Sequence, residues 1–108
     1  MEPSGAASWR PERRIDQDPD ESLTLDTLAE RSGLSPFHFL RTFRATTGQS
    51  PHQYVLRARL RRAATRLIVE RSRIAEVAFE CGFGDVSNFN RVFRREFGMS
   101  PRHYRKSQ

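Results

Sequence analysis

A stretch of sixteen residues occurs twice in this chain, and the second copy begins fifty residues after the first. Eight of the sixteen positions are identical, in the pattern Phe-x-Arg-x-Phe-Arg followed by Gly-x-Ser-Pro-x-x-Tyr. The copies run from Phe39 to Tyr54 and from Phe89 to Tyr104. Gly commonly ends a helix and Ser-Pro commonly begins one, so each copy predicts two consecutive helices. Because a stacked array needs more copies, two copies predict a pair of related units.

A second similarity lies just upstream of each copy. Leu28-Ala29-x-x-x-Gly33 precedes the first copy, and Val77-Ala78-x-x-x-Gly82 precedes the second. Each unit is therefore predicted to be a helix, a turn at Gly and a second helix, which is the helix-turn-helix arrangement of many DNA-binding proteins. The fold class that follows is all-α, with about seven helices and two helix-turn-helix subdomains joined by a long central linker helix.

Capping residues predict the limits of the first subdomain. Thr24 is the expected N-cap of a helix that ends at Gly33, and Ser35 is the expected N-cap of a helix that ends at Gly48. The first helix-turn-helix is therefore expected at 24–48.

The central helix and the second subdomain follow in the same way. Residues 51–70 are expected to form one linker helix, whose twenty residues span ~30 Å, close to the ~34 Å between successive major-groove segments of DNA. This length suggests that the linker sets the spacing between the two subdomains. Ser72 and Asp85 are the expected N-caps of the next two helices. The second helix-turn-helix is expected at 72–98, and a closing helix at 101–106.

The segment before the first subdomain differs in composition. Residues 1–22 hold three Arg and six acidic residues and are expected to form a loosely ordered acidic leader. Within it, a short helix is expected from Pro11 to about Gln17, with Ile15 as its apolar anchor. The DNA-binding domain is expected at 23–108.

The charge of the remaining chain indicates a polyanionic partner. From residue 23 onward there are sixteen basic and seven acidic residues, and all the basic ones except Lys106 are Arg. The planar guanidinium matches phosphate oxygens and guanine edges with two parallel hydrogen bonds. An Arg-rich genome would explain Arg in place of Lys, but it would not explain the excess of positive charge.

The helical period separates two faces on the second helix of each subdomain. Phe39 and Phe43 share one face, as do Phe89 and Phe93, and aromatic residues at this spacing are typical of a core. The opposite face of each helix carries a second set of repeated residues. This outward stripe consists of Phe37, Arg41 and Arg44 in the first copy and of Ser87, Arg91 and Arg94 in the second.

Several linked motifs of this chain resemble those of the AraC/XylS family of bacterial transcription regulators. They agree in order and spacing over about residues 23–106, which makes the resemblance more specific than a single Gly-containing helix pair. The motifs are Leu28 to Pro36, Arg59-Leu60-x-x-Ala63, Ile74-Ala75-Glu76-Val77-Ala78, and Gly82-Phe83 through Gly98-x-Ser100-Pro101-x-x-Tyr104-Arg105.

The resemblance implies two homeodomain-like helix-turn-helix subdomains that bind double-stranded DNA as one unit and activate, or sometimes repress, transcription. It also implies which positions face DNA. By similarity these are Phe37, His38, Leu40, Arg41 and Arg44 in the first subdomain and Val86, Ser87, Asn90, Arg91 and Arg94 in the second.

Side-chain chemistry suggests a role for most of these residues. Arg41 and Arg91 are the first candidates to read guanine O6 and N7, while the arginines three residues further on suit phosphates. Phe37 suits contact with a thymine methyl, Ser87 offers an adaptable hydroxyl, and Asn90 suits adenine or a phosphate. The half-sites should be about 10 bp apart, and unlike in sequence because the two readers differ.

Leu40 is apolar where many members of the family have a polar residue. This favours packing of Leu40 toward the protein and a less selective first reader.

Other residues are expected to have no site of their own. Cys81 follows Val77 by four residues on an apolar face, which favours a buried, inert thiol. The three histidines lack metal-ligand spacing, and the chain has no recognisable catalytic motif, so neither a metal or cofactor nor enzyme activity is expected. The linker arginines are candidates for phosphate contacts only: Arg57, Arg59, Arg61, Arg62 and Arg66.

The expected setting is the bacterial cytoplasm, on the nucleoid. No apolar stretch is long enough to cross a bilayer. A monomer suffices for this mode of DNA binding. Most members of the family carry a further effector-binding or dimerising domain, for which this chain has no room, so it is expected to be a stand-alone regulator or an excised module that dimerises only through such a domain.

Two alternatives remain open. The basic helices also suit a protein-interaction module that docks an acidic partner such as a subunit of RNA polymerase. RNA binding is less favoured, because the aromatic residues lie on the packing side of helices instead of on an exposed sheet.

Overall fold

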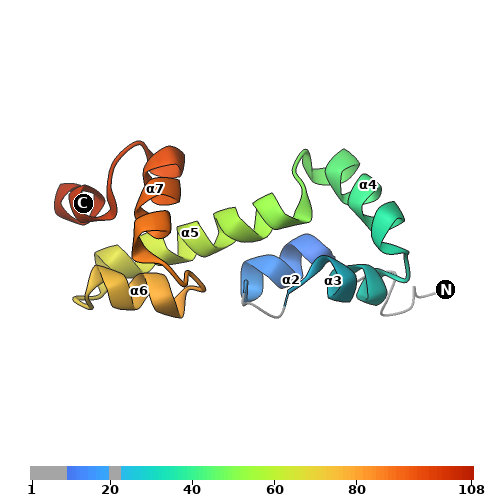
Figure 1. Ribbon diagram of the computed structural model, residues 1–108, viewed down its shortest axis with the longest axis horizontal. Coiled ribbons are helices and arrows are strands. Elements are labelled where there is room, and N and C mark those ends of the chain that lie inside the picture. The colour runs from blue at the N-terminus through green and yellow to red at the C-terminus, as the bar shows by residue number, and fades with distance from the viewer. Residues whose placement is uncertain (1–9, 20–22) are drawn as a thin grey trace. The chain divides into compact units, whose positions relative to one another are not determined.

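The computed structural model describes residues 10–19 and 23–108. Over these residues the chain forms seven α-helices and no strand, which confirms the all-α prediction (Figure 1). The parts of the expected leader at 1–9 and 20–22 lie outside the described residues. The helices are α2 (Pro11–Gln17), α3 (Leu25–Ser32), α4 (Pro36–Thr47), α5 (Pro51–Val69), α6 (Ile74–Glu80), α7 (Val86–Phe97) and α8 (Pro101–Ser107).

The helices form two compact units, and the boundary between them falls between Leu56 and Arg57, within α5. The first unit contains α2, α3, α4 and the start of α5, and the second contains the rest of α5 with α6, α7 and α8. α3 contacts α4 in the first unit, and α6 contacts α7 in the second. Each unit therefore holds one helix-turn-helix, and α5 is the long linker helix that the sequence predicts.

The repeated Gly-x-Ser-Pro sequence ends one helix and begins the next in both units. α4 and α7 each have 12 residues and end at Gly48 and Gly98, both with φ 77°. This left-handed backbone conformation strains residues with a Cβ atom, and Gly adopts it readily. Two residues later, Ser50 Oγ and Ser100 Oγ each accept a hydrogen bond of 3.2 Å from a backbone N–H in the first turn of α5 and α8.

Three predicted N-caps are confirmed. The side-chain oxygens of Thr24, Ser35 and Asp85 each accept a hydrogen bond from a backbone N–H in the first turn of α3, α4 and α7, at 3.0 to 3.2 Å. These bonds satisfy N–H groups that have no partner within the helix.

The predicted cap at Ser72 was wrong. The N-cap position of α6 is Arg73, and its side chain makes no capping hydrogen bond. Ser72 instead bonds through its hydroxyl to Glu70 Oε1 at 3.2 Å, and its carbonyl accepts a bond of 2.7 Å from Arg105 Nη2. The Ser72 hydroxyl that the sequence predicted to cap α6 therefore bonds within the turn between α5 and α6.

The core of the first unit is built around the predicted aromatic face of α4. The rings of Phe39 and Phe43 lie 5.5 Å apart between centroids, and Tyr54 meets Phe43 edge-on at 5.5 Å. The short helix expected at 11–17 is present as α2, and Ile15 is fully buried. The Tyr54 hydroxyl donates a hydrogen bond of 3.2 Å to Asp16 Oδ2, so α2 is joined to the start of α5.

The second unit repeats this core with more aromatic rings. Phe89 lies 5.0 Å from Phe83 and 5.5 Å from Phe93, between ring centroids. Phe93 and Phe97 both pack on Tyr104, each at 5.4 Å. The aromatic face of α7 is thus buried against α6 and α8, which leaves its other face to solvent.

Candidate nucleic-acid interface

α4 has one buried and one exposed face. Phe39 and Phe43 are buried, whereas the predicted DNA-facing residues of this helix are mostly exposed, and Phe37 is 69% exposed. Leu40 is half-buried, in keeping with its apolar side chain. The exposed members of the predicted set are Phe37, His38, Arg41 and Arg44.

α7 is arranged in the same way. Phe89 and Phe93 are fully buried, and all five residues predicted to face DNA are exposed. These are Val86, Ser87, Asn90, Arg91 and Arg94. Within each unit, the outward stripe that the helical period predicts is exposed. It consists of Phe37, Arg41 and Arg44 on α4 and of Ser87, Arg91 and Arg94 on α7.

The equivalent arginines of the two helices have different neighbours. The guanidinium carbon of Arg41 lies 5.1 Å from the centroid of the Phe37 ring, one helical turn earlier. Arg91 donates a hydrogen bond of 2.5 Å from Nη2 to Oδ1 of Asn88, three residues earlier. Sequence reasoning missed Asn88. The signal was available, since residues three apart on a helix lie on the same face.

Two linker arginines are engaged by carboxylates in the second unit. Arg57 Nε lies 3.3 Å from Glu96 Oε1. Arg66 forms two hydrogen bonds of 2.9 Å with Glu70 and one of 2.6 Å with Glu80. The hydrogen bonds that Arg66 donates to the Glu70 and Glu80 carboxylates raise the pKa of Arg66, and those to Glu70 lower the pKa of Glu70. Arg66 therefore supports the turn between α5 and α6, and it is a poorer candidate for a phosphate contact than the sequence suggested.

Cys81 is buried at the end of α6, which confirms the expected burial. Burial raises the pKa of the thiol, and the nearby Arg66 opposes this effect only in part. A protonated thiol is a weak nucleophile, so the position favours a packing role.

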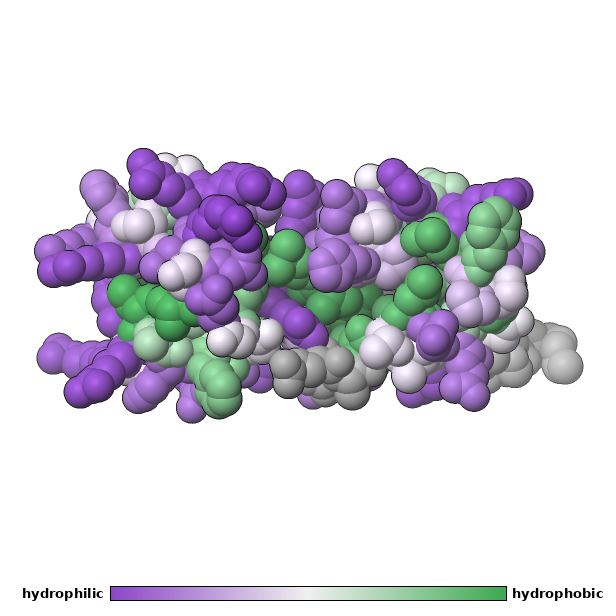
Figure 2. All heavy atoms as spheres, viewed as in Figure 1, coloured by the Kyte–Doolittle hydropathy of each residue, from purple (hydrophilic) through white to green (hydrophobic). Residues whose placement is uncertain are grey.

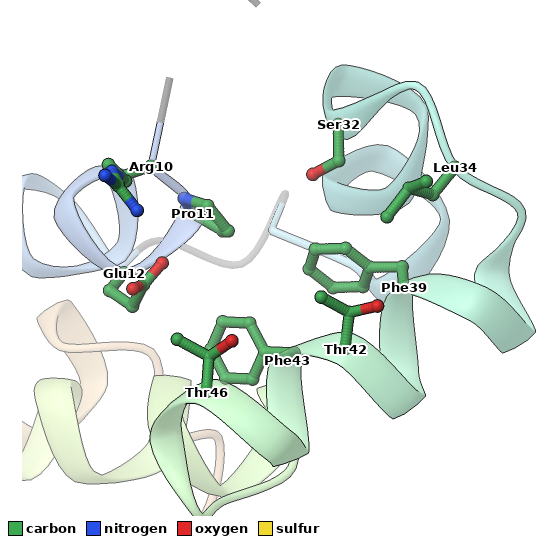
Figure 3. Close-up of a pocket in the computed structure, with 9 residues that line it drawn as sticks. All are labelled: Arg10, Pro11, Glu12, Ser32, Leu34, Phe39, Thr42, Phe43 and Thr46. Atoms are coloured by element: carbon green, nitrogen blue, oxygen red, sulfur yellow. The ribbon is translucent and has the colours of Figure 1, made fainter. Parts of the chain in front are cut away.

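A hollow of about 160 Å³ lies in the first unit between the start of α2 and the side of α4 (Figure 3). Figure 3 shows Phe39, Phe43 and the hydroxyls of Thr42 and Thr46 on the α4 side. The rim of the hollow carries the cation of Arg10 and the carboxylate of Glu12, so the charge of the hollow favours no class of ligand.

Figure 2 shows mostly hydrophilic residues on the visible surface, with smaller hydrophobic areas among them. Among the described residues, no group of three or more His, Cys, Asp or Glu side chains is placed to hold a metal ion. In that same part of the chain, no helix has the length and apolar character to cross a membrane.

Comparison with known proteins gives consistent matches. A family profile described as "Helix-turn-helix domain" matches residues 28–107. The regulatory protein SoxS of Salmonella typhimurium is 37% identical over 91 residues, which cover 84% of this chain and 85% of SoxS. The HTH-type transcriptional activator RhaS of Escherichia fergusonii is 36% identical over 88 residues, 82% of this chain and 32% of RhaS.

Solved structures agree with these matches. A probable AraC family transcriptional regulator from Rhodopseudomonas palustris has a TM-score of 0.84 at 25% identity, over 96% of this chain and 97% of that one. The DNA-binding domain of the global transcriptional factor AdpA, solved in complex with a target DNA, has a TM-score of 0.78 at 30% identity, over 92% and 93% of the two chains.

Proposed function

Since this chain belongs to the AraC/XylS family of DNA-binding transcription regulators, we propose that α4 and α7 are its two recognition helices and that they read successive major-groove segments of one duplex. The family consists of regulators and not of enzymes.

The observation that carries the proposal is the duplicated exposed arginine. Arg41 and Arg91 occupy equivalent positions in the repeat, each on the face opposite a buried Phe pair. A core does not require an exposed Arg at these positions. A guanidinium that makes two hydrogen bonds to guanine discriminates against the wrong base by ~1–3 kcal/mol, which gives both residues a function.

The other predicted residues surround these two. Arg44 and Arg94 are exposed one residue beyond the buried Phe pair, and we assign them to phosphates, which position a helix without reading sequence. Phe37 is assigned to a thymine methyl group and Asn90 to adenine or a phosphate. His38, Leu40, Val86 and Ser87 complete the proposed surface.

The target site follows from the differences between the helices. Phe37 and Leu40 in the first correspond to Ser87 and Asn90 in the second, so the two half-sites should differ in sequence. Their centres should be about 10 bp apart. One chain supplies both helices, so a monomer is expected to bind. The proposed limits are 24–48 and 72–98 for the two readers within a domain at 23–108.

The test is selection of bound duplexes from a random library at two salt concentrations, because phosphate contacts weaken with salt while base preferences persist. Two unlike motifs one helical turn apart support the proposal. Selection is then repeated with Arg41→Ala and with Arg91→Ala. Each variant should lose base preference in a different motif. A single motif, or equal weakening on all sequences, would sink two-groove reading.

The protein-docking alternative makes a different prediction. If the basic helices only contact an acidic protein, neither Arg→Ala variant changes base preference.

For a DNA regulator acting in the bacterial cytoplasm on the nucleoid, we propose activation through contact with RNA polymerase, supported by the likeness to the named activator RhaS. In-vitro transcription from a promoter that carries the selected site checks this, and reduced transcript would make the protein a repressor there.

A further inference from the structure

The equivalent arginines of the two recognition helices, Arg41 and Arg91, are held by different contacts. Phe37 stacks on Arg41 from one turn earlier, while Asn88 accepts a hydrogen bond from Arg91 from three residues earlier. In the repeat, Ser87 stands at the position of Phe37. His38 likewise stands at the position of Asn88, so neither the Phe ring nor the amide acceptor is repeated in the other helix.

These two contacts restrict a guanidinium to different degrees. A ring beneath the guanidinium sets the distance between the two planar groups but allows the guanidinium to rotate in its own plane. A hydrogen bond from Nη2 to an amide oxygen fixes the direction of one N–H as well. Arg has five N–H donors, so Arg91 keeps four for a base edge after it has bonded to Asn88. The orientation of the Arg91 guanidinium is therefore fixed before DNA binds. For Arg41, only the distance between the guanidinium and the Phe37 ring is fixed.

Asn88 is suited to this role by its own position. It lies in the first turn of α7, directly before the buried Phe89, and it is half-buried where its neighbours Ser87 and Asn90 are exposed. Its backbone is fixed by a helix that Asp85 caps. An acceptor on a fixed helix and a long, exposed arginine make an oriented pair.

We propose that Asn88 is a positioning residue that orients Arg91 for base reading, and that the second recognition helix consequently discriminates more sharply at its arginine position than the first does. This rests on the proposed reading of DNA by α7. Ordering a long side chain upon binding has a free-energy cost, and a side chain that is already ordered avoids part of it. This lower ordering cost strengthens binding only to the base that accepts the oriented N–H groups. It therefore increases discrimination between that base and the others.

The first experiment needs no DNA. NMR relaxation of the Arg side-chain Nε–H groups in the free protein reports their order on the ps–ns timescale. Arg91 should be more ordered than Arg41. Asn88→Leu, which keeps the shape but removes the acceptor, should reduce the order of Arg91 to the level of Arg41, and Asn88→Asp should retain it. Equal order of Arg91 in the protein and in Asn88→Leu would overturn the proposal.

The second experiment measures discrimination. The base pair read by Arg91 is the one whose preference disappears in Arg91→Ala. The ratio of affinities for the preferred and a substituted base pair at that position should fall roughly 2- to 10-fold in Asn88→Leu. Asn88→Asp should keep the ratio, although its added charge should weaken binding to all duplexes alike. An unchanged ratio in Asn88→Leu would overturn the proposal.

A double variant separates positioning from direct contact. In the Arg91→Ala background, Asn88→Leu should have no further effect on base preference, because the oriented group is gone. A further loss there would mean that Asn88 itself touches the base, which contradicts the proposal. The matched change in the other helix is His38→Asn together with Phe37→Ser, and it should raise the order of Arg41 in the free protein.

The failure of the inference and the failure of the proposed function are distinguishable. If Arg91→Ala changes no base preference, α7 does not read DNA through Arg91, and both are overturned. If Arg91→Ala changes a preference and Asn88→Leu leaves it intact, only the positioning role is lost. Thermal melting of each variant, with an unchanged midpoint, shows that the helix itself is intact.

Discussion

The Arg105 side chain in α8 donates a hydrogen bond of 2.7 Å to the carbonyl of Ser72, thirty-three residues earlier in the chain. It also donates through Nε to the carbonyl of Leu67 at 2.8 Å. Both carbonyls belong to the last turn of α5 or the connection after it, where carbonyls have no partner within a helix. One arginine therefore supplies donors for the end of the linker helix and joins it to α8.

Arg105→Ala should destabilise the protein by roughly 1–3 kcal/mol, because it leaves half-buried carbonyls without donors. Urea unfolding followed by circular dichroism measures the change. Arg102→Ala, an exposed arginine on the same helix, is the matched control and should change stability by less than about 0.5 kcal/mol. Equal effects of the two variants would show that the bonds of Arg105 contribute nothing beyond its charge.

Gly82→Ala should be destabilising, whereas Gly84→Ala should be nearly neutral. Gly82 has φ 98°, and a Cβ atom there would stand 3.2 Å from Arg59 Nε. The backbone strain alone should cost ~1–2 kcal/mol. A Cβ atom at Gly84 meets nothing within 4 Å, and its φ is not in the positive range. Melting temperatures of the two variants provide the comparison, and a stable Gly82→Ala protein would contradict the strained turn.

Ser35→Ala should lower stability by about 1 kcal/mol, since it removes the N-cap of α4. Ser72→Ala should cost less than this, because the Ser72 hydroxyl caps no helix and its bond of 3.2 Å goes to a Glu70 carboxylate that water also reaches. Chemical denaturation of both variants at neutral pH tests this order. A larger loss for Ser72→Ala would restore the capping role that the structure contradicts.

Stability should decline in acid partly through Glu70. The hydrogen bond from Arg66 is the main cause that lowers the pKa of Glu70 below its ordinary value of 4.5. A carboxyl with a lowered folded-state pKa stabilises the fold above its unfolded pKa, and this contribution is lost as the pH falls through the folded-state pKa. The urea midpoint of Glu70→Gln should therefore fall less steeply below pH 4.5 than that of the unaltered protein.

Local signals in the sequence were sufficient for most of the fold. The Gly-x-Ser-Pro repeat fixes both an end and a start, and the Phe pairs at helical spacing identify the buried faces of α4 and α7. The error at Ser72 has a long-range cause, since its carbonyl is taken up by Arg105 and its hydroxyl by Glu70. Such contacts depend on packing between distant segments, which propensity does not encode.

The candidate surface was predicted in the same way, from periodicity and resemblance. The exposure of Arg41 and Arg91 follows from helical geometry, because each lies opposite a buried Phe pair. Their neighbours differ between the copies, and this difference depends on rotamers. The Asn88 amide was overlooked because it is not one of the positions that the repeat shares.

α4 and α7 are each held by a capping side chain at the start, a left-handed Gly at the end and a Phe pair beneath. None of these constraints involves the side chains of the exposed residues proposed to face DNA. Those residues can therefore be replaced as a set without redesigning the helix that carries them. This makes either helix a natural place to graft a new base preference, one half-site at a time.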